Sequence, residues 1–480
     1  MSEYEAVIGL ETHIQLNTAS KIFCGCKADS WGDPANTNIC PVCTGLPGVL
    51  PVLNRAVVEK AVLLAFAMRA DSIQPRSYFA RKNYFYPDLP KGYQISQYDE
   101  PLGLGGFMDV PLTDDGHRRV MITKLHLEED AGKTVLQAGR RLIDFNRCGV
   151  PLVKMVTGPD IRSADEAAQY LIRLRQLLRW LGISEADMER GHLRCDANVS
   201  IRQRGSDVLN TKTETKNVNS IENVRDAIRA EIKRQIREVE AGRAIEPWTL
   251  DWDEDSGTLR KMRVKETEAD YRYFREPDLL PIELDESWRD AILTDFPELP
   301  LARRSRFSEQ YDIPIYDAEI LTEERSLADY YEQAVAEYGS DPKTVSNWLM
   351  NDVLRIMRSK GVAARDLQIH PHHLAAIIGM VDDKKITTNT AKALLDQVEE
   401  TGNSPQDIVE RENLAQVSDE GALRQVIADV IAGNPDQVQM YRRGKETLIG
   451  WFVGQVMRET KGKANPQLVQ ELFGEMLTEE

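Results

Sequence analysis

The stretch Met121-Ile-Thr-Lys-Leu-His-Leu-Glu-Glu-Asp-Ala-Gly-Lys133 is typical of a β-strand in which polar and apolar side chains alternate. Successive side chains of a strand point to opposite faces of a sheet. Lys124, His126 and Glu128 therefore share one face, and two leucines share the other. A row with a cation, an imidazole and a carboxylate can hold a divalent cation or move a proton. For one strand alone, a solvated outer face is the simpler interpretation.

Three further stretches repeat this alternation, which favours a shared polar face. Their polar positions are Glu11, His13 and Gln15; Arg194, Asp196, Asn198, Ser200 and Arg202; and Lys212, Glu214 and Lys216. Strands of this kind bury their apolar faces against helices and leave the polar face open. We therefore expect several strands to form one basin for a charged substrate.

Two amphipathic helices are predicted between and after these strands. Ser163-Ala-Asp-Glu166 is a capping box, and leucines follow it at helical spacing until Gly182. Asn219 is placed to cap the second helix, whose apolar stripe begins at Ile221 and ends before Gly242. Both patterns are typical of helices that cover a sheet.

The length and composition limit the class of protein. A chain of 480 residues is too long for one core and predicts two or three domains. Its net charge of −17 argues against broad binding to nucleic acid, DNA included, so RNA contacts must come from local basic patches. No apolar run approaches the ~20 residues of a membrane helix, and the first residues do not resemble a signal peptide. We expect a cytoplasmic protein without a membrane partner and with reduced cysteines.

Four of the six cysteines form two close pairs in a segment rich in Gly and Pro. The pairs are Cys24-Gly-Cys26 and Cys40-Pro-Val-Cys43. Two such pairs can supply four thiolates in a tetrahedron, which is the arrangement of a closed structural zinc site. The first pair is tighter than usual, and reduced loop thiols without metal are the alternative. The spacing favours structural zinc in the loop 24–43.

The residue pattern of the sequence changes near Pro297 and again near Thr401, and both points are candidate domain boundaries. We predict three domains, at 1–296, 297–402 and 403–480. The fold class is α+β: a largely antiparallel sheet domain with covering helices, then an all-α helical domain and a small all-α tail domain. The tail carries a basic excess that includes Lys461 and Lys463. Basic residues in a small appended domain favour RNA binding, although a solvated helix face has a similar composition.

Several long strings in this chain are far more specific than a short motif. They are Val7-Ile-Gly-Leu-Glu-Thr-His13, Arg81-Lys-Asn-Tyr-Phe-Tyr-Pro-Asp88, Tyr93-Gln-Ile-Ser-Gln97, Leu125-His-Leu-Glu-Glu-Asp-Ala-Gly-Lys133, Arg194-Cys-Asp-Ala-Asn-Val-Ser200, Asp270-Tyr-Arg-Tyr-Phe274, and the tail string from Gly454 to Pro466. With the four-cysteine loop, they resemble the B subunit of the aspartyl/glutamyl-tRNA amidotransferase, the GatB family. The resemblance covers essentially the whole chain. It implies that residues 1–296 form the catalytic cradle domain and that the tail binds tRNA.

The resemblance also implies a reaction and partners. Members are ATP-dependent ligases that act on misacylated Glu-tRNA(Gln) or Asp-tRNA(Asn). ATP phosphorylates the side-chain carboxylate, and ammonia then displaces phosphate to leave the amide. The A subunit releases this ammonia from glutamine, a channel carries it, and a small C subunit binds the pair together.

Site residues follow from the same resemblance. The catalytic candidates are Glu11, His13, Glu128 and Glu129, with His13 and Glu128 as ligands of Mg²⁺. Arg194, Asp196, Asn198, Glu214 and Lys216 would line the substrate basin. Imidazole is a less typical Mg²⁺ ligand than oxygen. The alternative role for His13 is therefore to act on the substrate or on a bound water. The chain has no complete Walker-type loop of the form Gly-x-x-x-x-Gly-Lys-Ser/Thr, so this motif does not locate ATP.

One position departs from the family pattern in a way that bears on catalysis. Lys154 stands where the family usually has a Glu that helps to hold the site cation, and Gly158 replaces another familiar Glu. Three hypotheses follow. The chain is an active transamidation subunit, a catalytically impaired tRNA-binding scaffold of the same complex, or a zinc-dependent hydrolase that uses His13. A zinc site closed by four thiolates argues against the hydrolase.

Overall fold

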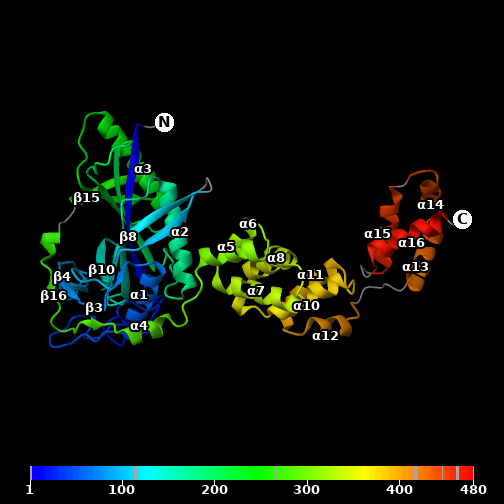
Figure 1. Cartoon of the computed structure of the whole chain (residues 1–480), viewed down its shortest axis with the longest axis horizontal. Helices are drawn as coiled ribbons and strands as arrows, with labels where there is room; N and C mark the ends of the chain where they lie inside the picture. Colours follow the sequence, from blue (N-terminus) through cyan, green and yellow to red (C-terminus); the bar gives the residue numbers. More distant parts are fainter. Residues whose placement is uncertain are drawn as a thin grey trace. The chain divides into compact units, whose positions relative to one another are not determined.

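The computed structural model of this chain describes residues 3–112, 116–264, 268–414, 420–445, 447–460 and 464–478 (Figure 1). The chain divides into two compact units, Met1–Leu299 and Pro300–Glu480. Within the described ranges, no helix is both long enough and apolar enough to cross a membrane.

The first unit is built on a large sheet with β1 (Tyr4–Gln15) near its middle. β1 pairs antiparallel with β11 (Pro151–Thr157) on one side and with β12 (Leu193–Gln203) on the other. Beyond β11 follow β8 (His117–Glu129), β5 (Tyr93–Ser96), β4 (Ala80–Asn83) and β16 (Phe274–Arg275). Beyond β12 follow β13 (Thr213–Lys216), β14 (Trp248–Asp253) and β15 (Thr258–Val264). Along this path only β13 and β14 pair in parallel among the described strands, which confirms the largely antiparallel α+β prediction.

Shorter strands extend the sheet or stand apart from it. The strands β2 (Ser72–Ile73), β6 (Gly103–Leu104) and β7 (Phe107–Pro111) join the sheet beside β8, while β3 (Arg76–Ser77) pairs with β17 (Ile282–Glu283). β9 (Lys133–Gln137) and β10 (Arg140–Asp144) form a separate, largely exposed ribbon.

Helices cover the apolar face of this sheet. They are α1 (Arg55–Ala67), α2 (Ala164–Trp180) and α3 (Ile221–Glu240), and a further helix, α4 (Glu286–Leu293), packs against α1. The hydroxyl of Ser163 accepts a hydrogen bond from the Glu166 backbone N–H, so the predicted cap of α2 is confirmed. The cap of α3 is Ser220, because its hydroxyl accepts from the Asn223 N–H. The prediction of Asn219 was wrong by one residue.

The core explains why the polar side chains are left on the opposite face. Ile8, Leu10 and Ile14 of β1 are buried against the helices, together with Leu125 and Leu127 of β8. These residues alternate with the acids and imidazoles of the same strands. Burying the apolar set therefore commits the polar set to the other face.

The second unit is helical in its described ranges. Its α-helices are α5 (Pro300–Gln310), α6 (Ile315–Leu321), α7 (Arg325–Tyr338), α8 (Pro342–Trp348), α9 (Leu354–Lys360), α10 (Pro371–Asp382), α11 (Thr388–Thr401), α12 (Pro405–Arg411), α13 (Glu420–Gly433), α14 (Pro435–Arg442), α15 (Leu448–Glu459) and α16 (Pro466–Thr478). The helices α13 to α16 share a core around Phe452 and Phe473. The division at 402/403 stays a prediction, and α12 packs against α10 and α11. Lys461 and Lys463 lie outside the described residues.

Candidate active site on the polar face of the sheet

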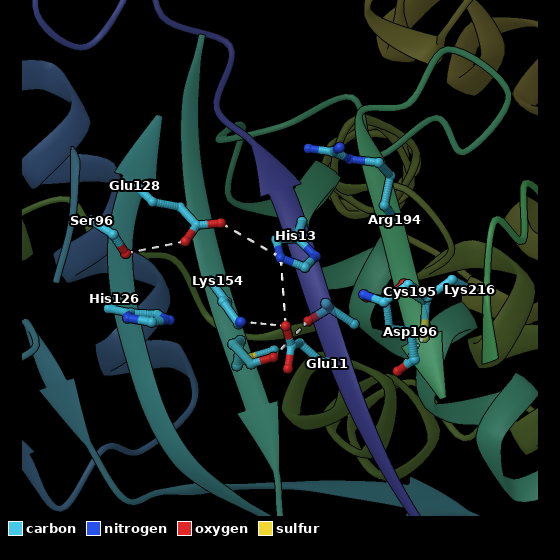
Figure 2. A network of polar contacts seen from close by, with 12 residues as sticks. Glu11, His13, Ser96, His126, Glu128, Lys154, Arg194, Cys195, Asp196 and Lys216 are labelled. Carbon is cyan, nitrogen blue, oxygen red and sulfur yellow. Dashed lines mark hydrogen bonds and ion pairs between the residues drawn. The ribbon is translucent and has the colours of Figure 1, made fainter. Parts of the chain in front are cut away.

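The polar side chains meet because the strand register aligns them. His13 of β1 lies opposite Lys154 of β11 and opposite Arg194 of β12. Lys154 in turn lies opposite His126 of β8. Side chains directly opposite each other in antiparallel strands are neighbours, with Cβ atoms about 4.5–5.5 Å apart. One row of cations and imidazoles therefore crosses four strands (Figure 2).

A second row carries the acids. Glu11 of β1 lies opposite Asp196 of β12. Lys216 of β13 donates to Asp196 Oδ2 at 2.5 Å, and its Nζ lies 3.7 Å from Glu214 Oε2. The two rows place carboxylates and ammonium groups side by side, so the face offers charge-assisted hydrogen bonds to a charged ligand.

His13 joins the acids of two strands. Its Nε2 lies 3.7 Å from Glu11 Oε1 and 3.5 Å from Glu128 Oε1 of β8. The Ser96 hydroxyl of β5 donates to the other Glu128 oxygen at 3.2 Å. Figure 2 shows this chain of contacts from Ser96 to Glu11. The structure therefore brings Glu11, His13 and Glu128 together.

Lys154 lies inside this group and forms an ion pair with Glu11 Oε1. Burial acts to raise the pKa of Glu11, but the Lys154 ammonium holds that pKa well below its usual range. Burial acts to lower the pKa of Lys154, but the nearby carboxylates of Glu11 and Glu128 outweigh this effect and raise that pKa. The pair is thus a carboxylate and an ammonium. Burial raises the pKa of Glu128 and outweighs the opposing effect of Lys154.

Both imidazoles of the row are neutral. Burial, reinforced by the charge of Lys154, lowers the pKa of His13 well below its usual value and that of His126 to about 3. His126 Nδ1 lies 2.7 Å from the carbonyl oxygen of Gln97. A carbonyl only accepts, so Nδ1 carries the proton and Nε2 has a free lone pair. Nε2 is buried and has no hydrogen-bond partner among the described residues, so it is an acceptor available to a ligand.

Glu129 lies apart from the other catalytic candidates. Because Glu129 directly follows Glu128 in β8, its side chain points to the opposite face of the strand. Its carboxylate forms an ion pair with Lys91 and accepts from the Ile95 backbone N–H at 2.9 Å. Lys91 and Glu129 line a cavity of about 220 Å³, which also touches Cys24 and Cys43. The structure therefore does not bring Glu129 into the polar basin, the group formed by Glu11, His13, Glu128, Lys154 and Asp196.

The predicted substrate residues have different surroundings. Asp196, Glu214 and Lys216 contact one another, as described above, and Asn198 lies opposite Glu214 in the register. Arg194 donates to Asp130 Oδ2 at 2.8 Å. Asp130 also accepts from Gln15 at 2.9 Å, and it lies 3.6 Å from Arg147. Arg194 is therefore anchored at one end of its row.

Two residues of the basin were not predicted. Ser96 supports Glu128 directly, and the alternation of Tyr93-Gln-Ile-Ser96 was the available signal. Lys82 of β4 has its pKa lowered by burial and by the charge of Lys154. Its Nζ lies 4.4 Å from the ring centre of Tyr271, which is close enough for a cation–π contact.

Three candidate ligands, two carboxylates and one imidazole, converge at the centre of the basin. One ligand atom each from Glu11, His13 and Asp196 lies within 4.8 Å of the others, so these residues fit one cation. Glu128 contacts this group through His13. The carboxylate oxygens of Glu11 and Asp196 suit Mg²⁺, whereas the imidazole of His13 is a less typical ligand for it. Lys154 contacts the same Glu11 carboxylate, so it competes with any such ion.

The four cysteines form a separate cluster, as their spacing predicted. The Sγ atoms of Cys24, Cys26, Cys40 and Cys43 all lie within 4.8 Å of one another. The Cys40 backbone N–H donates to Cys43 Sγ at 3.2 Å. Four sulfurs at this spacing fit a tetrahedral zinc ion and leave no open coordination position. His13 belongs to the other group, which weighs against a zinc-dependent hydrolase.

Comparison with known proteins identifies the class of this chain. The sequence model described as the GatB/GatE catalytic domain matches residues 6–290, and the one described as the GatB domain matches residues 329–477. The first match contains the polar basin and the cysteine cluster. The chain is thus built from a GatB-type catalytic domain followed by a GatB domain.

Relatives that match over their full length narrow this class to one family. The chain is 49% identical over 477 residues to the B subunit of the aspartyl/glutamyl-tRNA(Asn/Gln) amidotransferase of Prosthecochloris aestuarii, a match that covers 99% of this chain and 98% of that protein. It is 48% identical over 478 residues to the protein of the same name in Thermodesulfovibrio yellowstonii, covering 99% and 100%. The chain belongs to the family of aspartyl/glutamyl-tRNA(Asn/Gln) amidotransferase B subunits. The resemblance seen in the sequence is confirmed.

Proposed function

We propose that this chain catalyses the ATP-dependent transamidation of misacylated Glu-tRNA(Gln), Asp-tRNA(Asn) or both, in a complex with an A and a C subunit. The observation that carries the proposal is the polar basin, in which five strands bring Glu11, His13, Glu128, Lys154 and Asp196 together with Lys216. Family membership supports the same reaction, because the relatives are named as amidotransferase subunits for these tRNAs.

The chemistry explains why the basin needs both signs of charge. A carboxylate is a poor electrophile, so its phosphorylation supplies a leaving group. Phosphoryl transfer depends mainly on positioning and on cations at the phosphate oxygens. Lys154 and Lys216 are the ammonium groups placed for this role. In the second step the bond from carbon to ammonia nitrogen forms, the bond from carbon to phosphate oxygen breaks, and phosphate leaves with one ammonia proton.

The two metal ions are proposed to bind at separate sites. Glu11, His13 and Asp196 are proposed to hold a Mg²⁺ ion, which would neutralise phosphate charge when bound. Glu128 positions His13 and accepts from Ser96. The four cysteines are proposed to hold a structural zinc ion that cross-links the loop 24–43. Lys461 and Lys463 are proposed to contact tRNA phosphates.

The impaired-scaffold alternative has one observation in its favour. Lys154 forms an ion pair with Glu11, which is also a candidate ligand of the site cation. If this pair excluded the cation and replaced none of its effect, the chain would bind tRNA without activating it. The active subunit is preferred because Glu11, His13, Glu128 and Asp196 still lie together around Lys154, and because full-length relatives are named as amidotransferase subunits.

Reconstitution tests the proposal. The chain is combined with A and C subunits, ATP, glutamine and each misacylated tRNA, and amide formation is measured. We expect activity with at least one tRNA. Glu128→Ala should abolish phosphorylation of the side-chain carboxylate and spare tRNA binding, whereas Glu189→Gln at an exposed position should change neither. Full activity of Glu128→Ala would place the chemistry elsewhere.

A further inference from the structure

Lys21 is a fully buried lysine beside the four-cysteine cluster. Its side chain has an exposed fraction of 0%. The ammonium donates to the carbonyl oxygen of Asn38 at 2.9 Å and to Cys43 Sγ at 3.7 Å. Lysine is almost never fully buried unless its charge is paired, so the environment of this ammonium must supply negative charge.

No carboxylate in the described part of the chain supplies this negative charge. Among the residues that the structure describes, none of the Asp or Glu side chains lies within ion-pair distance of Lys21, whereas its neighbour Lys27 pairs with Asp33 at 2.8 Å. A buried cation without a counter-charge is strongly unfavourable. The adjacent sulfurs are therefore the remaining source of negative charge.

The backbone around Lys21 holds the ammonium against the cluster. The Lys21 backbone N–H donates to the Cys26 carbonyl, and the Asn38 N–H donates to the Asn146 side chain at 2.8 Å. Gly149 has a φ of +80°, and a Cβ there would lie 3.4 Å from Cys43 Cβ and 3.5 Å from Lys21 Cδ. The Gly149 backbone thus packs on both side chains, so Lys21 has little freedom to turn away from Cys43.

We propose that Lys21 is a positioning residue of the metal site, whose ammonium compensates an anionic zinc tetrathiolate and holds Cys43 as a ligand. A zinc ion with four thiolates carries a net charge of −2, and Lys21 reduces the charge of the buried group to −1. Partners of this kind orient metal ligands and tune affinity. The proposal concerns zinc binding alone and does not depend on the transamidation activity.

The test measures zinc affinity by competition with a chelating dye in the full-length chain. We expect Lys21→Met to weaken zinc binding by roughly 10- to 100-fold. Lys21→Gln keeps a donor for Asn38 but not the charge, so it should behave like Lys21→Met. If Lys21→Met does not fold, the zinc affinity of Lys21→Gln decides the test. Lys27→Met, on the exposed lysine of the same loop, is the matched control and should bind zinc as the unmodified chain does.

Repeating the measurement in a Cys40→His variant of the chain separates charge compensation from a purely structural role of Lys21. Cys40→His replaces one thiolate with a neutral imidazole and reduces the charge of the zinc group to −1. The loss caused by Lys21→Gln should then be clearly smaller than in the original background. Equal losses in both backgrounds, or unchanged zinc affinity in Lys21→Gln, would overturn the proposal.

Discussion

Lys154 offers the sharpest test of how the basin works. Its ammonium contacts Glu11, which also belongs to the candidate cation group with His13 and Asp196. Two variants separate its roles. Lys154→Met removes the charge and keeps most of the volume, whereas Lys154→Glu reverses the charge. If Lys154 serves the phosphate oxygens, both variants should slow carboxylate phosphorylation while strengthening Mg²⁺ binding.

The expected size follows from Coulomb's law. Two unit charges 4 Å apart interact by about 4 kcal/mol at an effective dielectric of ~20, so an ammonium and a dication at that separation repel by about 8 kcal/mol. The basin is partly open to solvent, since the Lys154 side chain is 17% exposed. If screening and relaxation leave only a quarter of this repulsion, about 2 kcal/mol remains. Removing it in Lys154→Met corresponds to a roughly 30-fold gain in Mg²⁺ affinity. Loss of a positioned charge at the phosphate should lower turnover by about 10²-fold.

The assay follows ATP-dependent turnover against Mg²⁺ concentration in the reconstituted complex. Lys233→Met, on an exposed lysine of α3, is the control and should match the unmodified chain in both turnover and Mg²⁺ dependence. Higher turnover in Lys154→Glu would refute the reasoning. It would mean that Lys154 only repels the cation and that the natural site is impaired.

Three further predictions concern other parts of the chain. Changing Cys24, Cys26, Cys40 and Cys43 to Ser should remove one zinc per chain and lower the melting temperature more than it lowers phosphorylation, as metal analysis and thermal unfolding will show; zinc retained by this variant would contradict the site. Replacing Lys461 and Lys463 with Ala should weaken binding to all tRNAs and make the slope of log affinity against log salt shallower by about 2, and an unchanged slope would exclude phosphate contacts. Because burial lowers the pKa of His126 to about 3, the unfolded chain binds more protons than the folded chain below the unfolded pKa of about 6.5, so stability should fall as the pH falls. Between pH 6.5 and 5.0 this residue should account for about 1.6 kcal/mol of the loss in unfolding free energy, and urea unfolding of His126→Gln should lack that part of the loss.

Side-chain alternation was sufficient to predict which residues share a face. The period of two placed Glu11 with His13 and His126 with Glu128, since an apolar face had to be buried. The same rule separates Glu128 from Glu129, but the shared motif led to both being grouped at the reaction centre. In the structure Glu129 pairs with Lys91 instead.

Strand pairing was the part that could not be predicted. Lys154 lies opposite both His13 and His126 only because β11 lies between β1 and β8. Nothing in the local pattern of β1 encodes this neighbour, which is about 140 residues away in the sequence. The cysteine cluster was easier to predict, because its ligands come from one short loop whose spacing reflects the geometry.

The central position of β1 also determines when the basin can form during synthesis. β1 begins at Tyr4, but its partners begin at Pro151 and Leu193. At 5–20 residues per second, β1 waits roughly 7 to 27 s after its own translation for its first neighbour to begin. During that time β1, which has one apolar face, lacks a partner at both edges, and this is the condition that favours capture by a chaperone or pairing with another chain. The basin is therefore assembled late, after about two-fifths of the protein has left the ribosome.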